Sequence, residues 1–175
     1  MNTSDYSLAE PTAIIVMGVS GSGKTTLAQH LAKRLEIEFL DADDFHPATN
    51  KAHMASGKPL TDAMRLPWVE ILRHRLDAEA AAGRSLSLAF SGLRKSHREL
   101  LRQSRGKKIF FHLTGAKALI AERMTARTGH FMPESLLDSQ FDTLEPPNSE
   151  PDIISLHIEH TIEQLTEQAL SHLHR

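Results

Sequence analysis

A short apolar run followed by a glycine-rich octapeptide constrains this chain more than any other feature. Residues 13–17 read Ala-Ile-Ile-Val-Met, which is typical of a strand buried on both faces. Residues 18–25 read Gly-Val-Ser-Gly-Ser-Gly-Lys-Thr and match the pattern G-x-x-x-x-G-K-[ST]. Leucines then recur at helical spacing over residues 27–35. The octapeptide therefore lies between a strand and a helix, which is the context in which this pattern binds phosphate.

The octapeptide predicts a site for a nucleoside triphosphate. Glycines let backbone N–H groups surround a phosphate, and the following helix directs its positive end at the same anion. Lys24 is expected to contact the β and γ oxygens, and Thr25 to offer its hydroxyl to Mg²⁺. The alternative is a tight glycine turn without a ligand, in which the full motif arises by accident. The predicted nucleotide-binding residues are Gly18, Val19, Ser20, Gly21, Ser22, Gly23, Lys24, Thr25, Thr26, Arg123 and Arg127.

The rest of the chain alternates strand and helix patterns. Further runs typical of strands lie at residues 38–41, 86–90, 109–113 and 153–156. Helical patterns between and after them predict an α/β fold, with a parallel sheet covered by helices on both faces. Prolines and glycines interrupt residues 41–67 and 128–151, where we expect short helices, loops and moving parts.

Length and charge narrow the class of protein. A chain of 175 residues fits one domain, residues 1–175, whose polar start, residues 1–11, we expect to be a flexible tail. The formal net charge is -2, so no general attraction to nucleic acid or to a membrane surface is expected. There are no cysteines, no apolar run of membrane-spanning length and no signal-peptide pattern at the start. A cytoplasmic protein is the expectation.

Acidic residues lie at the end of the second predicted strand and directly after it. In open α/β sheets, ligands lie beyond the carboxyl ends of the strands, so these carboxylates are expected to face the γ-phosphate. Asp41 would hold a magnesium-bound water, and Asp43 would accept the proton of an attacking hydroxyl. The alternative is that Asp43 and Asp44 cap a helix beginning near Phe45.

Basic residues follow the second and third strands. Arg65 or Arg94 is expected to clamp a substrate carboxylate through two parallel hydrogen bonds, for which guanidinium is suited. Solvated surface positions are the alternative for Lys95 and Arg98. Two more arginines, Arg123 and Arg127, lie four residues apart. They are expected to share a helix face, from which they would either stabilise the transferring group or form simple salt bridges.

Taken together, these motifs resemble the gluconokinase family, which comprises small P-loop kinases related in fold to shikimate and nucleoside monophosphate kinases. The resemblance runs from about Ile14 to about Pro146. Its marks are Met17–Lys24, Asp41–Pro47 with Asn50, Met54–Asp62, Arg65–Trp68, Ser91–Arg94 with Arg98–Arg102, Arg127–Phe131, Ser139–Phe141 and Leu144–Pro146.

The resemblance implies transfer of phosphate from ATP to D-gluconate, giving ADP and 6-phosphogluconate, with Mg²⁺ as cofactor. It also implies a sheet order of 2-3-1-4-5, an acceptor-binding segment at 41–67, a lid at 123–145 and a homodimer. The expected catalytic residues are Lys24, Asp43 and Arg127. The expected substrate-binding residues are Asp43, His46, Arg65, Arg94, His130 and Gln140, and the metal is expected at Thr25 and, through water, at Asp41.

Several acceptor-side positions depart from the family pattern, namely His53, Met64, Gly92, Arg94 and His97. Another small sugar acid or a shikimate-like acid therefore stays open as the acceptor. A nucleotide-binding module without turnover is the alternative from a different functional class.

Overall fold

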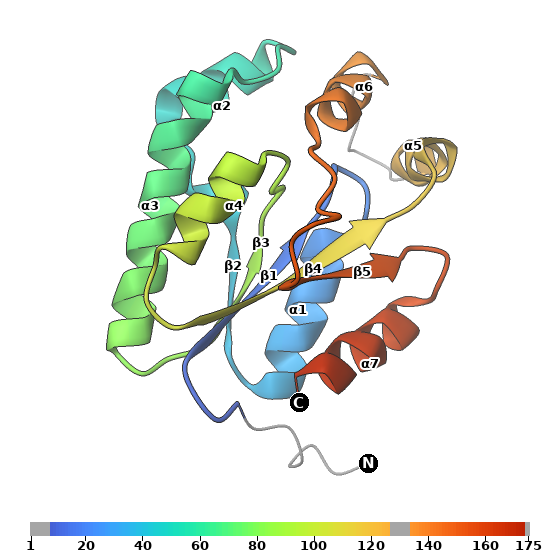
Figure 1. Ribbon diagram of the computed structural model, residues 1–175. Helices are drawn as coiled ribbons and strands as arrows, with labels where there is room; N and C mark the ends of the chain where they lie inside the picture. Colours follow the sequence, from blue (N-terminus) through green and yellow to red (C-terminus); the bar gives the residue numbers. More distant parts are fainter. Residues whose placement is uncertain (1–7, 127–133, 174–175) are drawn as a thin grey trace.

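The computed structural model describes residues 8–126 and 134–173, and five parallel strands form its centre (Figure 1). The strands are β1 Thr12–Met17, β2 Glu38–Asp41, β3 Leu86–Ala89, β4 Lys107–Thr114 and β5 Ile153–His157. Their order in the sheet is β2-β3-β1-β4-β5, and every pairing is parallel. The predicted fold class and strand order are confirmed.

Helices cover both faces of the sheet. They are α1 Lys24–Leu35, α2 Ala48–Ala55, α3 Asp62–Ala81, α4 Lys95–Arg102, α5 Lys117–Ala126, α6 Glu134–Thr143 and α7 Ile162–His172, with a 3₁₀ turn, η1, at Ala42–Phe45. Figure 1 shows α3 and α4 on one side of the sheet and α1 with α7 on the other, while α2 and α6 lie near the carboxyl ends of the strands. Within residues 8–126 and 134–173, no helix combines the length and the apolar character needed to cross a bilayer.

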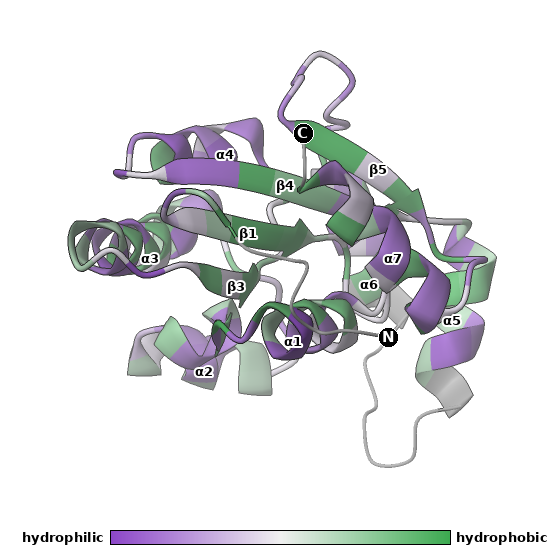
Figure 2. Cartoon of the chain, turned by 90° about the horizontal axis from the view of Figure 1, so that it is seen from below, coloured by the Kyte–Doolittle hydropathy of each residue, from purple (hydrophilic) through white to green (hydrophobic). Residues whose placement is uncertain are grey.

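The side chains of β1 alternate between two hydrophobic layers. Ile14 and Val16 pack with α1 and α7, whereas Ile15 and Met17 pack with α3 and α4. All six β1 residues are buried, as expected for a central strand with a helix layer on either side. Figure 2 shows the same arrangement as largely hydrophobic strands between helices whose outward surfaces are more hydrophilic. This packing fixes the end of β1, from which the glycine loop begins.

The interrupted segment predicted at 41–67 ends earlier than expected, because α3 begins at Asp62 and continues through Pro67. The hydroxyl of Thr61 caps the helix by accepting a hydrogen bond from the backbone N–H of Met64 at 3.2 Å. Proline removes one helical hydrogen bond and costs roughly 3 kcal/mol in a helix interior. The next two residues, Trp68 and Val69, are almost fully buried, and each contributes on the order of 2 kcal/mol of hydrophobic stabilisation. Tertiary burial thus outweighs the local helix-breaking signal.

Candidate active site

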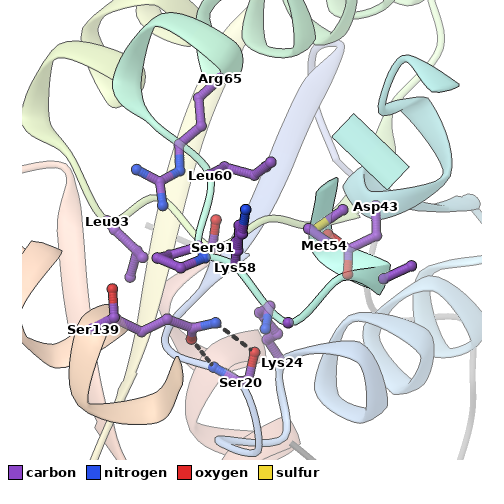
Figure 3. A pocket seen from close by; sticks show the side chains of 14 residues that line it. Ser20, Lys24, Asp43, Met54, Lys58, Leu60, Arg65, Ser91, Leu93 and Ser139 are labelled. Atoms are coloured by element: carbon purple, nitrogen blue, oxygen red, sulfur yellow. Dashed lines mark hydrogen bonds between the residues drawn. The ribbon is translucent and has the colours of Figure 1, made fainter. Parts of the chain in front are cut away.

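A cavity of about 550 Å³ opens at the carboxyl ends of the strands (Figure 3). Its wall combines the glycine loop (residues 18–25), the start of η1, the connection between α2 and α3, the loop after β3, and α6. The lining residues are Ser20, Lys24, Asp43, Met54, Ala55, Gly57, Lys58, Pro59, Leu60, Arg65, Ser91, Leu93, Ser139 and Gln140. Residues predicted to bind the phosphate donor and residues predicted to bind the acceptor therefore line the same cavity.

The glycine loop presents the amino end of α1 as an anion site. Gly23 precedes the helix with φ 97°, a left-handed conformation that favours glycine. Gly23 has no side chain, so the N-cap residue itself supplies no side-chain acceptor to the start of α1. The hydroxyl of Ser22 is buried without a hydrogen-bond partner among the described residues. These groups are the donors that a phosphate would satisfy.

The charge on the cavity wall suits anions. Among the described lining residues, Lys24, Lys58 and Arg65 are basic, and Asp43 is the single acid. Figure 3 shows Lys24 and Ser20 at one side of the cavity and Arg65 at the opposite side. Asp43 lies to the right of Lys24 in this view. Such an arrangement accommodates polyphosphate near Lys24 and a second anionic group near Arg65.

The two predicted aspartates have different roles in the fold. Asp41 Oδ1 accepts a hydrogen bond from the backbone N–H of Asp43 at 3.0 Å and so caps η1. Burial raises the pKa of Asp41, and the negative charges of Asp43 and Asp44 act in the same direction, whereas the hydrogen bond from the backbone N–H of Asp43 and the charge of Lys24 act against them. The alternative that Asp43 or Asp44 caps a helix near Phe45 is wrong, because the turn begins earlier and Asp41 caps it. The Asp43 side chain instead stays exposed and lines the cavity.

His46 lies behind Asp43. Its side chain is only 3% exposed, and its Nε2 is 3.8 Å from Asp43 Oδ1. The imidazole stacks on Trp68 with ring centroids 4.0 Å apart, and its Nδ1 is 3.2 Å from Nδ2 of Asn50. Burial lowers the pKa of His46 to about 4, with smaller contributions from Lys51 and Arg65, so the imidazole is neutral near pH 7.

The two predicted carboxylate-binding arginines differ in position. Arg65 lines the cavity, and its Nη1 lies 3.2 Å from Asp62 Oδ1. Arg94 contacts the same Asp62 oxygen through Nε at 3.4 Å and contacts Glu145 Oε1 through Nη1 at 3.8 Å. Asp62 therefore joins the two guanidinium groups, with Arg65 on the cavity side.

Lys95 and Arg98 also differ. Lys95 is exposed, as its solvated alternative predicts. For Arg98 that alternative is wrong, because its side chain is fully buried and its Nε and Nη2 both donate to Glu150. Nη1 donates to the carbonyl of Gly92 at 2.6 Å, and Nη2 also donates to that of Glu145 at 3.1 Å. The guanidinium thus connects the loop after β3 with the segment after α6.

The segment predicted as a lid, 123–145, is described in part. Arg127 and His130 lie outside the described residues, and Arg123 Nη2 donates to the carbonyl of Ile158 at 2.7 Å. Gln140, on α6, contacts the glycine loop: its Oε1 accepts from the backbone N–H of Ser20 at 2.7 Å, and its Nε2 donates to Ser20 Oγ at 2.9 Å (Figure 3). The contact places α6 directly against the predicted phosphate site.

Sequence reasoning missed Lys58 and the residues that orient His46. Lys58 follows Gly57, which has a left-handed φ of 82°, and both residues line the cavity between α2 and α3. A glycine and a proline on either side of a lysine would have been a usable signal for an exposed loop cation. Asn50 is 97% buried, and its side chain donates a hydrogen bond to the carbonyl of Met64. No local sequence pattern predicts this burial.

The side-chain oxygens near the glycine loop fit a Mg²⁺ ion whose other ligands are mainly phosphate oxygens. Magnesium in such sites takes one or two protein ligands together with substrate phosphates and water. Thr25 is half-buried at the start of α1, and Asp41 is the last residue of β2, at the same end of the sheet. The described residues contain no cluster of three or more His, Asp or Glu side chains able to hold a metal alone. A hydroxyl and a carboxylate beside a triphosphate suit this cation.

Comparisons with known proteins agree with this geometry. The family model described as an AAA domain matches residues 14–147. The chain is 42% identical to the thermosensitive gluconokinase of Escherichia coli (strain K12) over 89% of this chain and 84% of that protein. It is 40% identical to the gluconokinase of Gluconobacter oxydans (strain 621H), with 93% and 92% of the two chains covered.

A solved structure extends the likeness to three dimensions. The crystal structure of a gluconokinase from Sinorhizobium meliloti 1021 matches with a TM-score of 0.86 and 37% identity, and the match covers 94% of this chain and 93% of that one. The sheet order, the glycine loop and these similarities over nearly the whole chain lead to one conclusion. The chain belongs to the gluconokinase family of P-loop kinases.

Proposed function

We propose that this protein is a gluconokinase, which transfers the γ-phosphoryl group of ATP to D-gluconate and releases ADP and 6-phosphogluconate. The observation that carries the proposal is the shared cavity: Ser20 and Lys24 of the glycine loop line it together with Asp43 and Arg65 of the acceptor side. The family relationship supports ATP as donor and gluconate as acceptor.

On the donor side, the N–H groups of residues 18–25 and the amino end of α1 bind the β-phosphate. Lys24 places its ammonium group against the β and γ oxygens and stabilises the charge that develops as the phosphoryl group leaves ADP. Mg²⁺, held by Thr25 and through water by Asp41, would neutralise further negative charge on the phosphates.

On the acceptor side, Asp43 accepts the proton of the attacking gluconate hydroxyl. A bond forms between that oxygen and the γ-phosphorus, and the bond from the γ-phosphorus to the bridging oxygen breaks. ADP leaves with the electron pair of that bond. Arg65 binds the gluconate carboxylate, and Lys58 adds a second positive charge to the same wall.

The remaining expectations complete the proposal. Residues 123–145 act as a lid, Arg127 stabilises the transferring group, and His130 contacts the acceptor. The working unit is a homodimer in the cytoplasm. Light scattering of purified protein tests the subunit count, and Arg127→Ala tests the role of Arg127 through a loss in kcat.

The deciding experiment measures ADP release in the presence of gluconate, shikimate and a panel of other sugar acids. We expect gluconate to give the highest kcat/KM, with 6-phosphogluconate identified by mass spectrometry. Lys24→Ala should abolish turnover, and Asp43→Asn should lower kcat by about 10²-fold while ATP binding is retained. ADP release that does not depend on gluconate would remove gluconate as the acceptor. Turnover with a different acid would identify the alternative.

A further inference from the structure

Asn50 determines which nitrogen of His46 carries the proton. Its side-chain nitrogen, Nδ2, donates to the backbone carbonyl of Met64 at 2.9 Å. Because a carbonyl only accepts, the nitrogen of the amide must lie on that side, and the orientation of the amide is fixed. The same nitrogen has a second hydrogen, and His46 Nδ1 lies 3.2 Å from it.

His46 Nδ1 must therefore act as the acceptor. A neutral imidazole has one donor nitrogen and one acceptor nitrogen, so the proton lies on Nε2. That Nε2 lies 3.8 Å from Asp43 Oδ1. The stacked ring of Trp68 holds the imidazole in this plane. The indole nitrogen of Trp68 in turn donates to the carbonyl of Ala42, next to Asp43 in sequence, at 2.7 Å.

Burial keeps His46 neutral near pH 7, because it lowers the pKa of the imidazole. The positive charges of Lys51 and Arg65 also disfavour a second proton. Asp43 is the acid that faces the ring. A neutral N–H beside a carboxylate donates a hydrogen bond without removing the negative charge that a base requires. The distance of 3.8 Å is longer than a hydrogen bond, as catalytic contacts often are before substrate binds.

We propose that His46 is a positioning residue that acts through Asp43, and that Asn50 sets its tautomer. Asp43 lines the cavity with its side chain 72% exposed, whereas His46 lies behind it with its side chain almost fully buried. The Nε2–H holds the carboxylate towards the acceptor hydroxyl. This role differs from direct substrate binding by His46, and it rests on the proposed function in that Asp43 is taken as the base.

Two substitutions separate the N–H from the ring. His46→Gln keeps an amide N–H near the position of Nε2 but loses the stacked ring. His46→Phe keeps a ring against Trp68 but has no donor. We expect kcat to fall about tenfold in His46→Gln and about a hundredfold in His46→Phe, with the KM for ATP unchanged in both. A purely structural role predicts the reverse order, so a His46→Phe enzyme at least as active as His46→Gln overturns the proposal.

A double-mutant comparison tests whether His46 acts through Asp43. In an Asp43→Asn background, His46→Phe should lower kcat by less than about twofold, because the group that it positions is already lost. Independent losses that multiply would overturn the proposal. If wild-type protein has no turnover with gluconate or any other acid, the proposed function fails, and the tautomer of His46 is still measurable.

That tautomer is read directly from ¹⁵N-labelled histidine in wild-type protein. The His46 resonances are assigned by their loss in His46→Gln. We expect protonated Nε2 and unprotonated Nδ1 at about pH 7, and a shift towards the Nδ1–H form in Asn50→Leu. A wild-type ring that is protonated at Nδ1, or at both nitrogens, overturns the assignment. Where His46→Phe or Asn50→Leu does not fold, this measurement on wild-type protein still tests the tautomer.

Discussion

The side-chain amide of Gln140 is hydrogen-bonded at both ends to Ser20, although 120 residues separate them in sequence. The oxygen of Gln140 occupies the backbone N–H of Ser20, and its nitrogen donates to the Ser20 hydroxyl. Ser20 belongs to the glycine loop, and Gln140 belongs to α6. The contact therefore links α6 to the phosphate site.

Replacing Gln140 with leucine should detach α6 from the glycine loop. Two neutral hydrogen bonds contribute about 1 kcal/mol each, so we expect kcat/KM to fall by up to roughly thirtyfold and hydrogen exchange in residues 134–143 to become faster. Gln140→Glu should weaken ATP binding further than Gln140→Leu does, because it adds a negative charge beside the phosphate site.

The matched control is Asp142→Asn, which alters an exposed side chain on the same helix. Its kinetics and hydrogen exchange should stay close to those of wild-type protein. Tighter ATP binding by Gln140→Glu would contradict the prediction.

We expect replacement of Arg98 to lower the stability of the fold strongly. Its fully buried guanidinium pairs with Glu150 and donates to the carbonyls of Gly92 and Glu145. Arg98→Met leaves those carbonyls without this donor, although Glu150 keeps Arg102 at 2.9 Å. Because breaking a buried ion pair typically costs 3–5 kcal/mol, we expect the free energy of unfolding to fall by about 3 kcal/mol in urea titrations.

The surface pair of Arg34 and Glu167 supplies the comparison for Arg98. Both side chains are at least 33% exposed, so Arg34→Met should cost less than about 1 kcal/mol. Equal losses in the two variants would show that the buried network around Arg98 adds nothing.

The donor half of the site was predictable because its signals are local. A β-branched run, a glycine motif and leucines at helical spacing follow one another over residues 13–35, and they form β1, the loop and α1. The strand order depended on the family resemblance, since alternation of patterns alone does not order five strands.

The acceptor half was less predictable for two reasons. Some of its contacts join residues far apart in the sequence, and others depend on the exact residue at which a turn begins. The cap of η1 falls to Asp41 rather than Asp43 because the turn begins at Ala42. His46 is buried because Trp68, 22 residues later, stacks on it. The spacing of His46 and Trp68 in the sequence does not predict that their rings stack.

Arg65 and Arg94 should differ in their effect on the acceptor. Arg65 lines the cavity, whereas Arg94 is paired with Asp62 and Glu145 beside it. Lysine keeps the charge but loses the two-pronged contact with a carboxylate. We therefore expect Arg65→Lys to raise the KM for gluconate by about tenfold, and Arg94→Lys by less than about threefold, which corresponds to loss of one charge-assisted hydrogen bond in the first case.

The KM for ATP serves as the internal control for both substitutions and should not change. A larger rise in the gluconate KM for Arg94→Lys than for Arg65→Lys would reassign the carboxylate contact to Arg94.

Stability should fall steeply as pH drops below the ordinary histidine range. Burial lowers the pKa of both His46 and His112 from 6.5 to about 4. Between these values the unfolded chain binds protons that the folded protein does not, so the free energy of unfolding is highest above pH 6.5 and decreases towards pH 4. The decrease amounts to about 2 kcal/mol for each histidine between about pH 7.5 and pH 5, measured by urea unfolding.

His112→Leu isolates one of these contributions. His112 lies in β4 and is 6% exposed, with Arg98 adding to the effect of burial on its pKa. Leucine in its place cannot titrate, so the loss of stability between about pH 7.5 and pH 5 should shrink by about 2 kcal/mol. An identical pH dependence in wild-type protein and His112→Leu would mean that folding does not shift the pKa of His112.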